Sequence, residues 1–190
     1  RDLAAAVLRA VELERATPDF SADEHYRPGA LIFGETGALL AEILRARAET
    51  HGTLVVLPKT VARAGGIFQA ACVTGRVTMI GQSFFDPLPA GADLYLLKSV
   101  LSDWPDRQAT ALLRRCAEAA RPSGRVVVLS GVSPDEGAGG ASPELLMMVL
   151  VGGKDRTLAE FRVLARDARM EVLSAERQPS GRFVVECRPA

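Results

Sequence analysis

The feature that most constrains the fold is an alternation of short apolar runs with segments of helical periodicity. Five runs have the length and composition of strands, at residues 30–34, 53–57, 76–80, 93–100 and 125–131. Helix-like segments follow three of them, at residues 38–49, 61–72 and 106–120. Strands that are apolar on both faces and alternate with helices favour a parallel sheet covered by helices on both sides. The sequence therefore predicts an α/β fold.

The last part of the chain has a different pattern. A helix-like segment at residues 158–170 is followed by two β-rich runs, 171–177 and 182–188, with QPSG between them. A turn that contains proline and glycine between two strands is typical of a hairpin. We therefore expect the last strand to run antiparallel to its neighbour. The composition of SPDEGAGGASPE, at residues 133–144, is typical of a flexible surface loop.

Composition excludes several kinds of partner. The 190 residues include 23 Lys and Arg against 23 Asp and Glu, so no net field draws the chain to nucleic acid or to an anionic membrane. The most apolar run, at residues 145–151, is far shorter than the roughly 20 residues that span a bilayer. The three cysteines lie far apart and outside any CxxC pattern, which argues against a disulfide framework or a zinc site. We expect a soluble, cytoplasmic protein with a small-molecule partner and no metal.

Four stretches together resemble one enzyme family. They are GTLVVLPKTVARA, GQSFFDPLPAGADLYLLKSVLSDWPD, RPSGRVVVLSGV and LLMMVLVGGKDRTLAEFRVLA. In order and spacing they are similar to the catalytic domain of S-adenosylmethionine-dependent small-molecule O-methyltransferases, the caffeate-type and bacterial polyketide-tailoring enzymes. The resemblance covers residues 30–190. It implies a Rossmann-like class I methyltransferase fold, with a mostly parallel seven-stranded sheet and a C-terminal antiparallel hairpin.

The resemblance also bears on domain organisation. In this family a helical dimerisation domain precedes the catalytic domain. Residues 1–29 contain one helix-like segment, at residues 3–14, and a break near TPDFS. We expect residues 1–29 to be a leading helix and linker, which could be a remnant of the dimerisation domain, and residues 30–190 to be the methyltransferase domain. Because the chain opens with Arg1, we regard it as a candidate piece of a longer chain that could form a homodimer.

The family's glycine-rich turn for the cofactor corresponds to ALIFGETG, at residues 30–37. Gly34 and Gly37 match the family's glycines, and the resemblance makes them cofactor-binding. Leu31 stands where the family has an aspartate, and Phe33 and Glu35 replace two glycines. A phenylalanine would occupy space that a nucleoside needs, and a glutamate would bring a charge that must be solvated or paired. The alternative is an ordinary strand-to-helix turn whose glycines serve the backbone.

The resemblance places further cofactor contacts at Val56, Leu57, Ser83, Phe84, Lys98 and Trp104. Val56 replaces the acid that accepts the ribose hydroxyls, and each unsatisfied buried hydroxyl costs about 1 to 3 kcal/mol. Ser83 replaces the acid near the adenine amine, whereas Phe84 could still flank a ring. Lys98 and Trp104 match the family. We therefore expect S-adenosylmethionine to bind weakly or not at all. Phe85 we assign to the core.

The family's catalytic histidine corresponds to Ser102, in the stretch YLLKSVLSDWPD. The neighbouring Asp103 matches the family's aspartate. A serine hydroxyl is a weak base near neutral pH and cannot take the histidine's part. The two histidines of the chain, His25 and His51, fall in loop-like segments without the spacing to replace it.

Two family glutamates that position the histidine and the substrate correspond to Ser130 and Asp155. Asp155 keeps the negative charge and remains a candidate for the catalytic site. Its alternative role is that of an acid at a helix N-terminus near Thr157. Met147 and Met148 correspond to the family's acceptor pocket and could contact an apolar substrate, or they could simply fill the core.

Acidic and basic positions of the family's site are changed here, while the apolar strands and the turn glycines are kept. We interpret this as a fold that is retained without its usual chemistry. The chain is then an O-methyltransferase-family domain that acts on a small aromatic or polyketide-like natural product, with an eroded S-adenosylmethionine site and histidine base, and not an ordinary methyltransferase. Two alternatives stay open: an active S-adenosylmethionine-dependent O-methyltransferase with an atypical site, and a non-catalytic binding or assembly partner.

Overall fold

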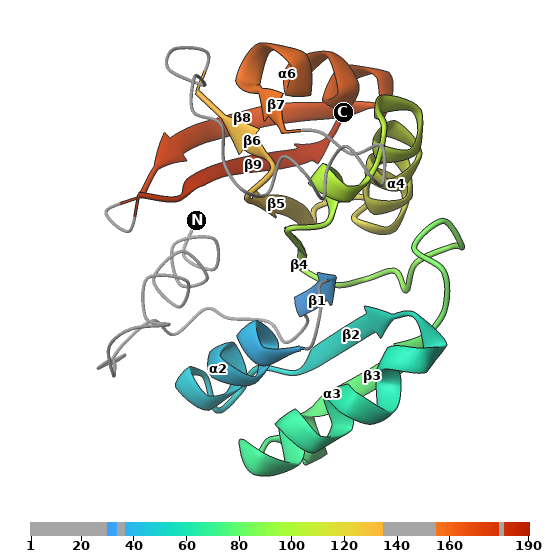
Figure 1. Cartoon of the computed structure of the whole chain (residues 1–190), viewed down its shortest axis with the longest axis vertical. Coiled ribbons are helices and arrows are strands. Elements are labelled where there is room, and N and C mark those ends of the chain that lie inside the picture. The colour runs from blue at the N-terminus through green and yellow to red at the C-terminus, as the bar shows by residue number, and fades with distance from the viewer. Residues whose placement is uncertain (1–29, 34–36, 135–154, 179–180) are drawn as a thin grey trace.

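One sheet organises the fold (Figure 1). The computed structural model of the chain describes residues 30–33, 37–134, 155–178 and 181–190. The strands of the sheet are β1 (Ala30–Phe33), β2 (Gly52–Val56), β3 (Val77–Gly81), β4 (Leu94–Lys98), β5 (Arg125–Leu129), β8 (Met170–Arg177) and β9 (Phe183–Pro189). Their order across the sheet is β3-β2-β1-β4-β5-β9-β8, so the seven strands form one continuous layer.

The strand directions divide the sheet into two parts. β1 is parallel to β2 and β4, β2 is parallel to β3, and β4 is parallel to β5. β9 is antiparallel to both of its neighbours, β5 and β8. The predicted α/β class and the predicted C-terminal hairpin are confirmed, and the sheet is mixed because β9 runs against the rest.

Helices cover both faces of the sheet and create two apolar clusters. On one face lie α2 (Ala38–Ala46) and α3 (Pro58–Ala70), and on the other lie α4 (Asp106–Ala119) and α6 (Leu158–Asp167). Successive strand residues point to opposite faces. Leu54 and Val56 of β2 therefore join the α2–α3 cluster, whereas Val55 joins the α4–α6 cluster. This double burial explains why the inner strands β2, β4 and β5 are mostly apolar on both faces, whereas the edge strand β3 is partly exposed.

Local chemistry sets where several elements begin and end. α3 starts at Pro58, earlier than predicted, because proline fits the first turn of a helix, where its missing N–H is not needed. The predicted strand at 93–100 ends at Lys98, since Ser99 has a φ of 52°. β5 ends at Leu129 for the same reason, because φ is 71° at Ser130 and 82° at Gly131. Left-handed backbone cannot continue a strand.

Gly37 illustrates a glycine that the fold itself requires. It precedes α2 with a φ of 79°, and a Cβ added there would lie 2.6 Å from Cζ of the buried Phe68. Backbone conformation and packing each favour glycine at this position. The interpretation of Gly37 as a structural glycine therefore has support that does not depend on any cofactor.

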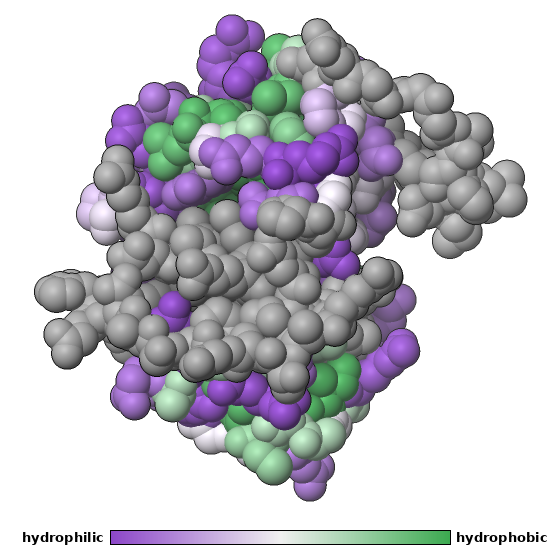
Figure 2. All heavy atoms as spheres, turned by 90° about the vertical axis from the view of Figure 1, so that its left-hand side faces the viewer, coloured by the Kyte–Doolittle hydropathy of each residue, from purple (hydrophilic) through white to green (hydrophobic). Residues whose placement is uncertain are grey.

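The described surface mixes polar and apolar side chains. The large apolar side chains that are exposed are Leu57, Met79, Val163 and Leu173, and they belong to different elements. In the view of Figure 2, purple and green residues alternate over the upper and the lower parts of the molecule. Scattered apolar residues of this kind are normal on a protein surface.

Candidate functional site

The predicted site residues gather where the parallel strands end. Val56 ends β2, Lys98 ends β4, and Ser130 directly follows the end of β5. The carboxyl ends of parallel strands lie at one edge of a sheet, and ligands of such folds bind there. The structure therefore brings the positions assigned to the cofactor and to the base to one edge. His51 precedes β2 and so lies at the opposite edge, away from Ser102.

Val56 faces the helices at this edge. Its side chain is 2% exposed and belongs to the α2–α3 cluster, and its carbonyl oxygen accepts a hydrogen bond from Gln82 N at 3.0 Å. Leu57, the next residue, is 40% exposed and directly precedes α3. The position that the family uses for a ribose acceptor thus holds an apolar side chain packed on apolar neighbours.

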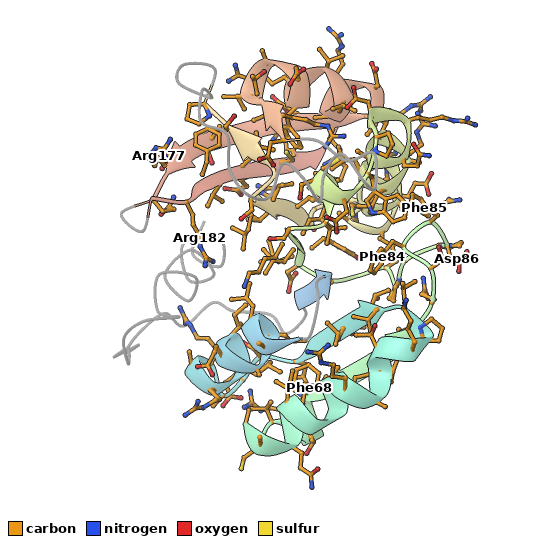
Figure 3. All side chains as sticks on the ribbon, viewed as in Figure 1. Phe68, Phe84, Phe85, Asp86, Arg177 and Arg182 are labelled. Carbon is orange, nitrogen blue, oxygen red and sulfur yellow. The ribbon has the colours of Figure 1, made fainter. Side chains whose placement is uncertain are left out.

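Ser83 stabilises its own turn. Its Oγ accepts a hydrogen bond from Phe85 N at 3.2 Å, and its carbonyl oxygen accepts one from Asp86 N, also at 3.2 Å. Figure 3 places Phe84, Phe85 and Asp86 together on the loop that follows β3. The hydroxyl that was expected near the adenine amine therefore has a local backbone partner.

An aromatic pair links this loop to the Ser102 segment. The rings of Phe85 and Trp104 meet edge to face, with their centroids 5.0 Å apart and an interplanar angle of 84°. The Phe85 carbonyl oxygen also accepts a hydrogen bond from Arg115 Nε at 2.9 Å. Phe84, Phe85 and Trp104 are partly buried against the α4–α6 cluster. The Phe85 ring therefore packs on the core, and Trp104 already has an aromatic neighbour.

Ser102 lies in a short turn that touches the end of β5. The turn is the 3-10 helix η3 (Leu101–Asp103). A Cβ added to Gly131 would lie 3.3 Å from Ser102 N and 3.4 Å from Ser102 Cβ. The segment of Ser130 and Gly131 therefore packs directly against Ser102, so the structure brings together the positions of the family's base and of one of its orienting acids.

Asp103 and Asp155 are both exposed. Asp155 precedes β7 (Arg156–Thr157), a two-residue strand that pairs in parallel with β6 (Val132–Ser133). The N-terminal cap of α6 is made by Thr157 and Glu160, each of which accepts a hydrogen bond from the other's backbone N–H. Asp155 makes none of these capping contacts, but it lies two residues before the N-cap, so both interpretations of it stay open.

Sequence reasoning missed Arg156. It is 1% exposed and has the largest fully buried side chain in the described part of the chain. Its Nη1 donates to the Leu101 carbonyl oxygen at 2.8 Å, its Nη2 to the Trp104 carbonyl oxygen at 2.6 Å, and its Nε to Asp106 Oδ1 at 2.9 Å. In the sequence Arg156 stands in the charged stretch KDR, which carries no signal of burial, and the sequence does not show which carbonyl groups it would meet.

Several predicted residues lie outside what the structure describes. These are His25, Gly34, Glu35, Met147, Met148 and the helix predicted at residues 3–14. For Leu31 and Phe33 the register is defined: Leu31 lies beside Thr53 and Tyr95, and Phe33 beside Val55 and Leu97. Among the described residues, no group of three or more His, Cys, Asp or Glu side chains could hold a metal ion. None of the described helices has the length and apolarity to cross a membrane.

Comparison with known proteins agrees with this geometry. A family model described as an O-methyltransferase domain matches residues 31–170. The 2,7-dihydroxy-5-methyl-1-naphthoate 7-O-methyltransferase of Streptomyces carzinostaticus is 44% identical over 144 residues, which are 76% of this chain and 43% of that protein. The aclacinomycin 10-hydroxylase RdmB of Streptomyces purpurascens is 37% identical over 160 residues, which are 82% of this chain and 42% of that protein.

Solved structures of O-methyltransferases also match this chain. The O-methyltransferase NcsB1 from neocarzinostatin biosynthesis, in complex with S-adenosylmethionine and 2-hydroxy-5-methyl naphthoic acid, has a TM-score of 0.77 at 38% identity. The match covers 85% of this chain and 49% of that one. The chain thus spans about half the length of the relatives it matches. The sheet order, the site positions and these matches agree. The chain belongs to the family of S-adenosylmethionine-dependent small-molecule O-methyltransferases.

Proposed function

We propose that this chain corresponds to the catalytic domain of the O-methyltransferase family and binds a small aromatic natural product. We also propose that it does not methylate ordinary phenols. The observation that carries the proposal is Ser102. It occupies the position of the family's base, packs against the Ser130 and Gly131 segment, and lies at the opposite edge from His51. No histidine of the described residues is therefore available to deprotonate a phenol at this edge.

The ligand class rests on the relatives. One of them, by its name, acts on a dihydroxylated naphthoate, and NcsB1 has been crystallised with naphthoic acids. All of these are small, planar and aromatic. Apolar and aromatic groups at the carboxyl edge of this chain, such as Leu57 and Phe84, suit a flat ring.

S-adenosylmethionine is the expected cofactor of the family, and NcsB1 holds it or its demethylated product in solved structures. In this chain the described residues do not fit its ribose. The Val56 side chain offers the ribose no acceptor and is packed among apolar side chains. The Ser83 hydroxyl, at the position of the acid near the adenine amine, already has a backbone partner. We infer that the cofactor binds weakly or not at all, and we derive no reaction step from it.

Isothermal titration calorimetry tests the cofactor and the acceptor separately. We expect S-adenosylmethionine to bind with a dissociation constant weaker than low micromolar, and 1,4-dihydroxy-2-naphthoic acid, a ligand of NcsB1, to bind measurably. Methyl incorporation from labelled S-adenosylmethionine into a panel of phenols should stay at background. Robust turnover by the unmodified protein would show instead that it is an active methyltransferase with an atypical site.

A second experiment rebuilds the family's site. Ser102→His alone should not produce methyl transfer, because general-base catalysis contributes about 100- to 10,000-fold only when the donor is already bound and aligned. A combined variant, assayed at a pH and temperature where circular dichroism shows it to be folded, should recover more than the sum of the single changes, since base, orienting acid and donor site act as a unit. Its changes are Val56→Asp, Ser83→Asp, Ser102→His and Ser130→Glu. Activity in Ser102→His alone equal to that of the combined variant would contradict this reasoning.

Two alternative functions have specific support. The 44% identity to a naphthoate methyltransferase favours retained methyl transfer. The 37% identity to a hydroxylase favours a changed reaction on a polycyclic substrate, since that relative's name assigns it a different chemistry. A non-catalytic binding or assembly partner is the third candidate, and it predicts acceptor binding without turnover of any kind.

We also propose that residues 30–190 form the methyltransferase-type domain and that residues 1–29 precede it as a helix and linker. The apolar residues of that helix would then be a contact surface for the rest of a longer chain or for a second copy. They are Leu3, Val7, Leu8 and Val11. Sedimentation of this chain beside a longer native one tests the idea, and identical monomeric behaviour of both would remove it.

A further inference from the structure

Arg156 connects the turn that carries Ser102 to the two-stranded sheet of β6 and β7. We propose that Arg156 is a positioning residue for ligand binding: it holds residues 101–104, here called the 101–104 turn, against the pair of strands β6 and β7. In this way it sets where Ser102 and Trp104 lie at the carboxyl edge of the sheet. The proposal rests on the proposed function only for its effect on ligand affinity.

The backbone hydrogen bonds within the 101–104 turn are long. Its 3-10 hydrogen bonds run from Asp103 N to the Val100 carbonyl oxygen at 3.2 Å and from Trp104 N to the Leu101 carbonyl oxygen at 3.3 Å. These lengths are at or beyond the long end for N–H···O bonds, which are about 2.7 to 3.2 Å. The two Arg156 bonds to the same turn are shorter, 2.8 and 2.6 Å, and they are charge-assisted. The side chain of Arg156 therefore supplies the stronger constraint.

Arg156 is itself held by its backbone. Its N–H donates to the Gly131 carbonyl oxygen at 3.1 Å, and its carbonyl oxygen accepts from Ser133 Oγ at 3.3 Å. It pairs with Val132 in the small sheet, and the cap of α6 begins at the next residue. Since Gly131 also packs on Ser102, the turn is contacted from two sides by one connected segment. A shift of Arg156 must therefore move the turn.

Geometry and charge can be separated by two substitutions. The Arg156 side chain is 0% exposed, whereas its ion-pair partner Asp106 is 54% exposed. Arg156→Lys keeps the charge, but an ammonium group is a point charge and cannot reproduce the planar fork that reaches both carbonyl groups. Asp106→Asn keeps an oxygen acceptor for Nε and removes only the exposed negative charge. Arg162→Lys, on the exposed side of α6, is a matched control.

Trp104 reports on the turn without any ligand, because it is the single tryptophan of the chain. We expect Arg156→Lys to shift its emission to longer wavelength and to increase acrylamide quenching, with an unchanged far-ultraviolet circular dichroism spectrum. Asp106→Asn should change both signals less, and Arg162→Lys should leave them as in the parent protein. In calorimetry, Arg156→Lys should weaken the binding of 1,4-dihydroxy-2-naphthoic acid by on the order of tenfold or more.

Folded Arg156→Lys with the parent's emission, quenching and naphthoate affinity would overturn the proposal. Should that variant not fold, hydrogen exchange of the parent protein decides: the amides of Asp103 and Trp104 should be protected, and free exchange at both would refute a clamped turn. If the parent protein itself binds no naphthoate, the proposed function fails, whereas the fluorescence and exchange results still test the role of Arg156.

Discussion

Replacing Val56 by aspartate restores the residue type that the family has at the end of β2, and the structure predicts that this change destabilises the fold. Val56 is 2% exposed and packs in the α2–α3 cluster, where its neighbours are aliphatic and aromatic side chains of the sheet and two helices. A carboxylate there would lie among the apolar side chains of this cluster. The substitution therefore removes an apolar contact and places a charge in its position.

The magnitude follows from two contributions. Removing the buried valine side chain costs about 1.5 to 3 kcal/mol. Burial of an ionised carboxylate costs several kcal/mol more, unless the carboxyl group takes up a proton with a raised pKa. Each unit by which the pKa is raised corresponds to about 1.36 kcal/mol. We expect Val56→Asp to lose about 3 to 5 kcal/mol at pH 8, which is a large part of the roughly 5 to 15 kcal/mol that stabilises a domain.

The pH dependence separates charge from packing. Because the folded-state pKa of the new carboxyl group is raised, its penalty is absent below the unfolded pKa of about 3.9 and complete only above the folded pKa. In urea unfolding, the free energy of unfolding of Val56→Asp should therefore fall further below that of the matched Val56→Asn as the pH rises from 5 to 8. Equal stability of the two variants at pH 8 would refute this reasoning. It would mean that the carboxylate reaches water at the edge of the sheet and that the ribose site is easily rebuilt.

Thiol reactivity and glycine packing give two further predictions. Desolvation by burial raises the pKa of the Cys116 and Cys187 thiols, the latter to about 12, whereas Cys72 is exposed. A disulfide reagent at pH 8 should thus label one thiol quickly in the folded protein and all three after unfolding. Fast labelling of all three thiols in the folded protein would contradict the burial of two of them. Gly52→Ala should lower the free energy of unfolding in urea by about 1 to 3 kcal/mol, because the new Cβ would lie 2.4 Å from Cδ1 of the buried Leu40 in α2. Gly66→Ala, with no atom within 4 Å of its Cβ, should instead be neutral or stabilising by up to about 1 kcal/mol, and equal losses in both would contradict the packing argument.

Periodicity was sufficient to predict most of the sheet. Strands that are apolar on both faces can only be buried between two helical layers, and the QPSG turn leaves little choice but a hairpin. The strand ends were harder to predict. Ser99 and Ser130 adopt left-handed backbone, with φ of 52° and 71°, and serine carries no local signal for that conformation. Tertiary contacts at the carboxyl edge hold them there, so the predicted strands were too long.

The candidate site was predicted by position but not by contact. The family resemblance placed Ser102 and Ser130 in one site, and the structure brings their segments together through Gly131. The resemblance could not show that the Ser83 hydroxyl bonds to its own turn. Nor could it show that Arg156 reaches residues more than fifty positions earlier in the chain. The first contact depends on the local conformation of the loop after β3, and the second on the packing of segments that are distant in the sequence.

The position of β9 between β5 and β8 has a consequence for the order of assembly. β9 follows β8 in the chain, yet it must enter the interior of the sheet, where Val126 lies beside Cys187, which comes 61 positions later in the sequence. The two-stranded hairpin can form locally, but until it docks, the hydrogen-bonding edge of β5 stays open. An open apolar edge is a site for wrong pairing between chains. Of the seven strands, the one that comes last along the sequence is thus the one that covers the edge of β5, and the folding yield of this domain depends on how quickly the hairpin reaches it.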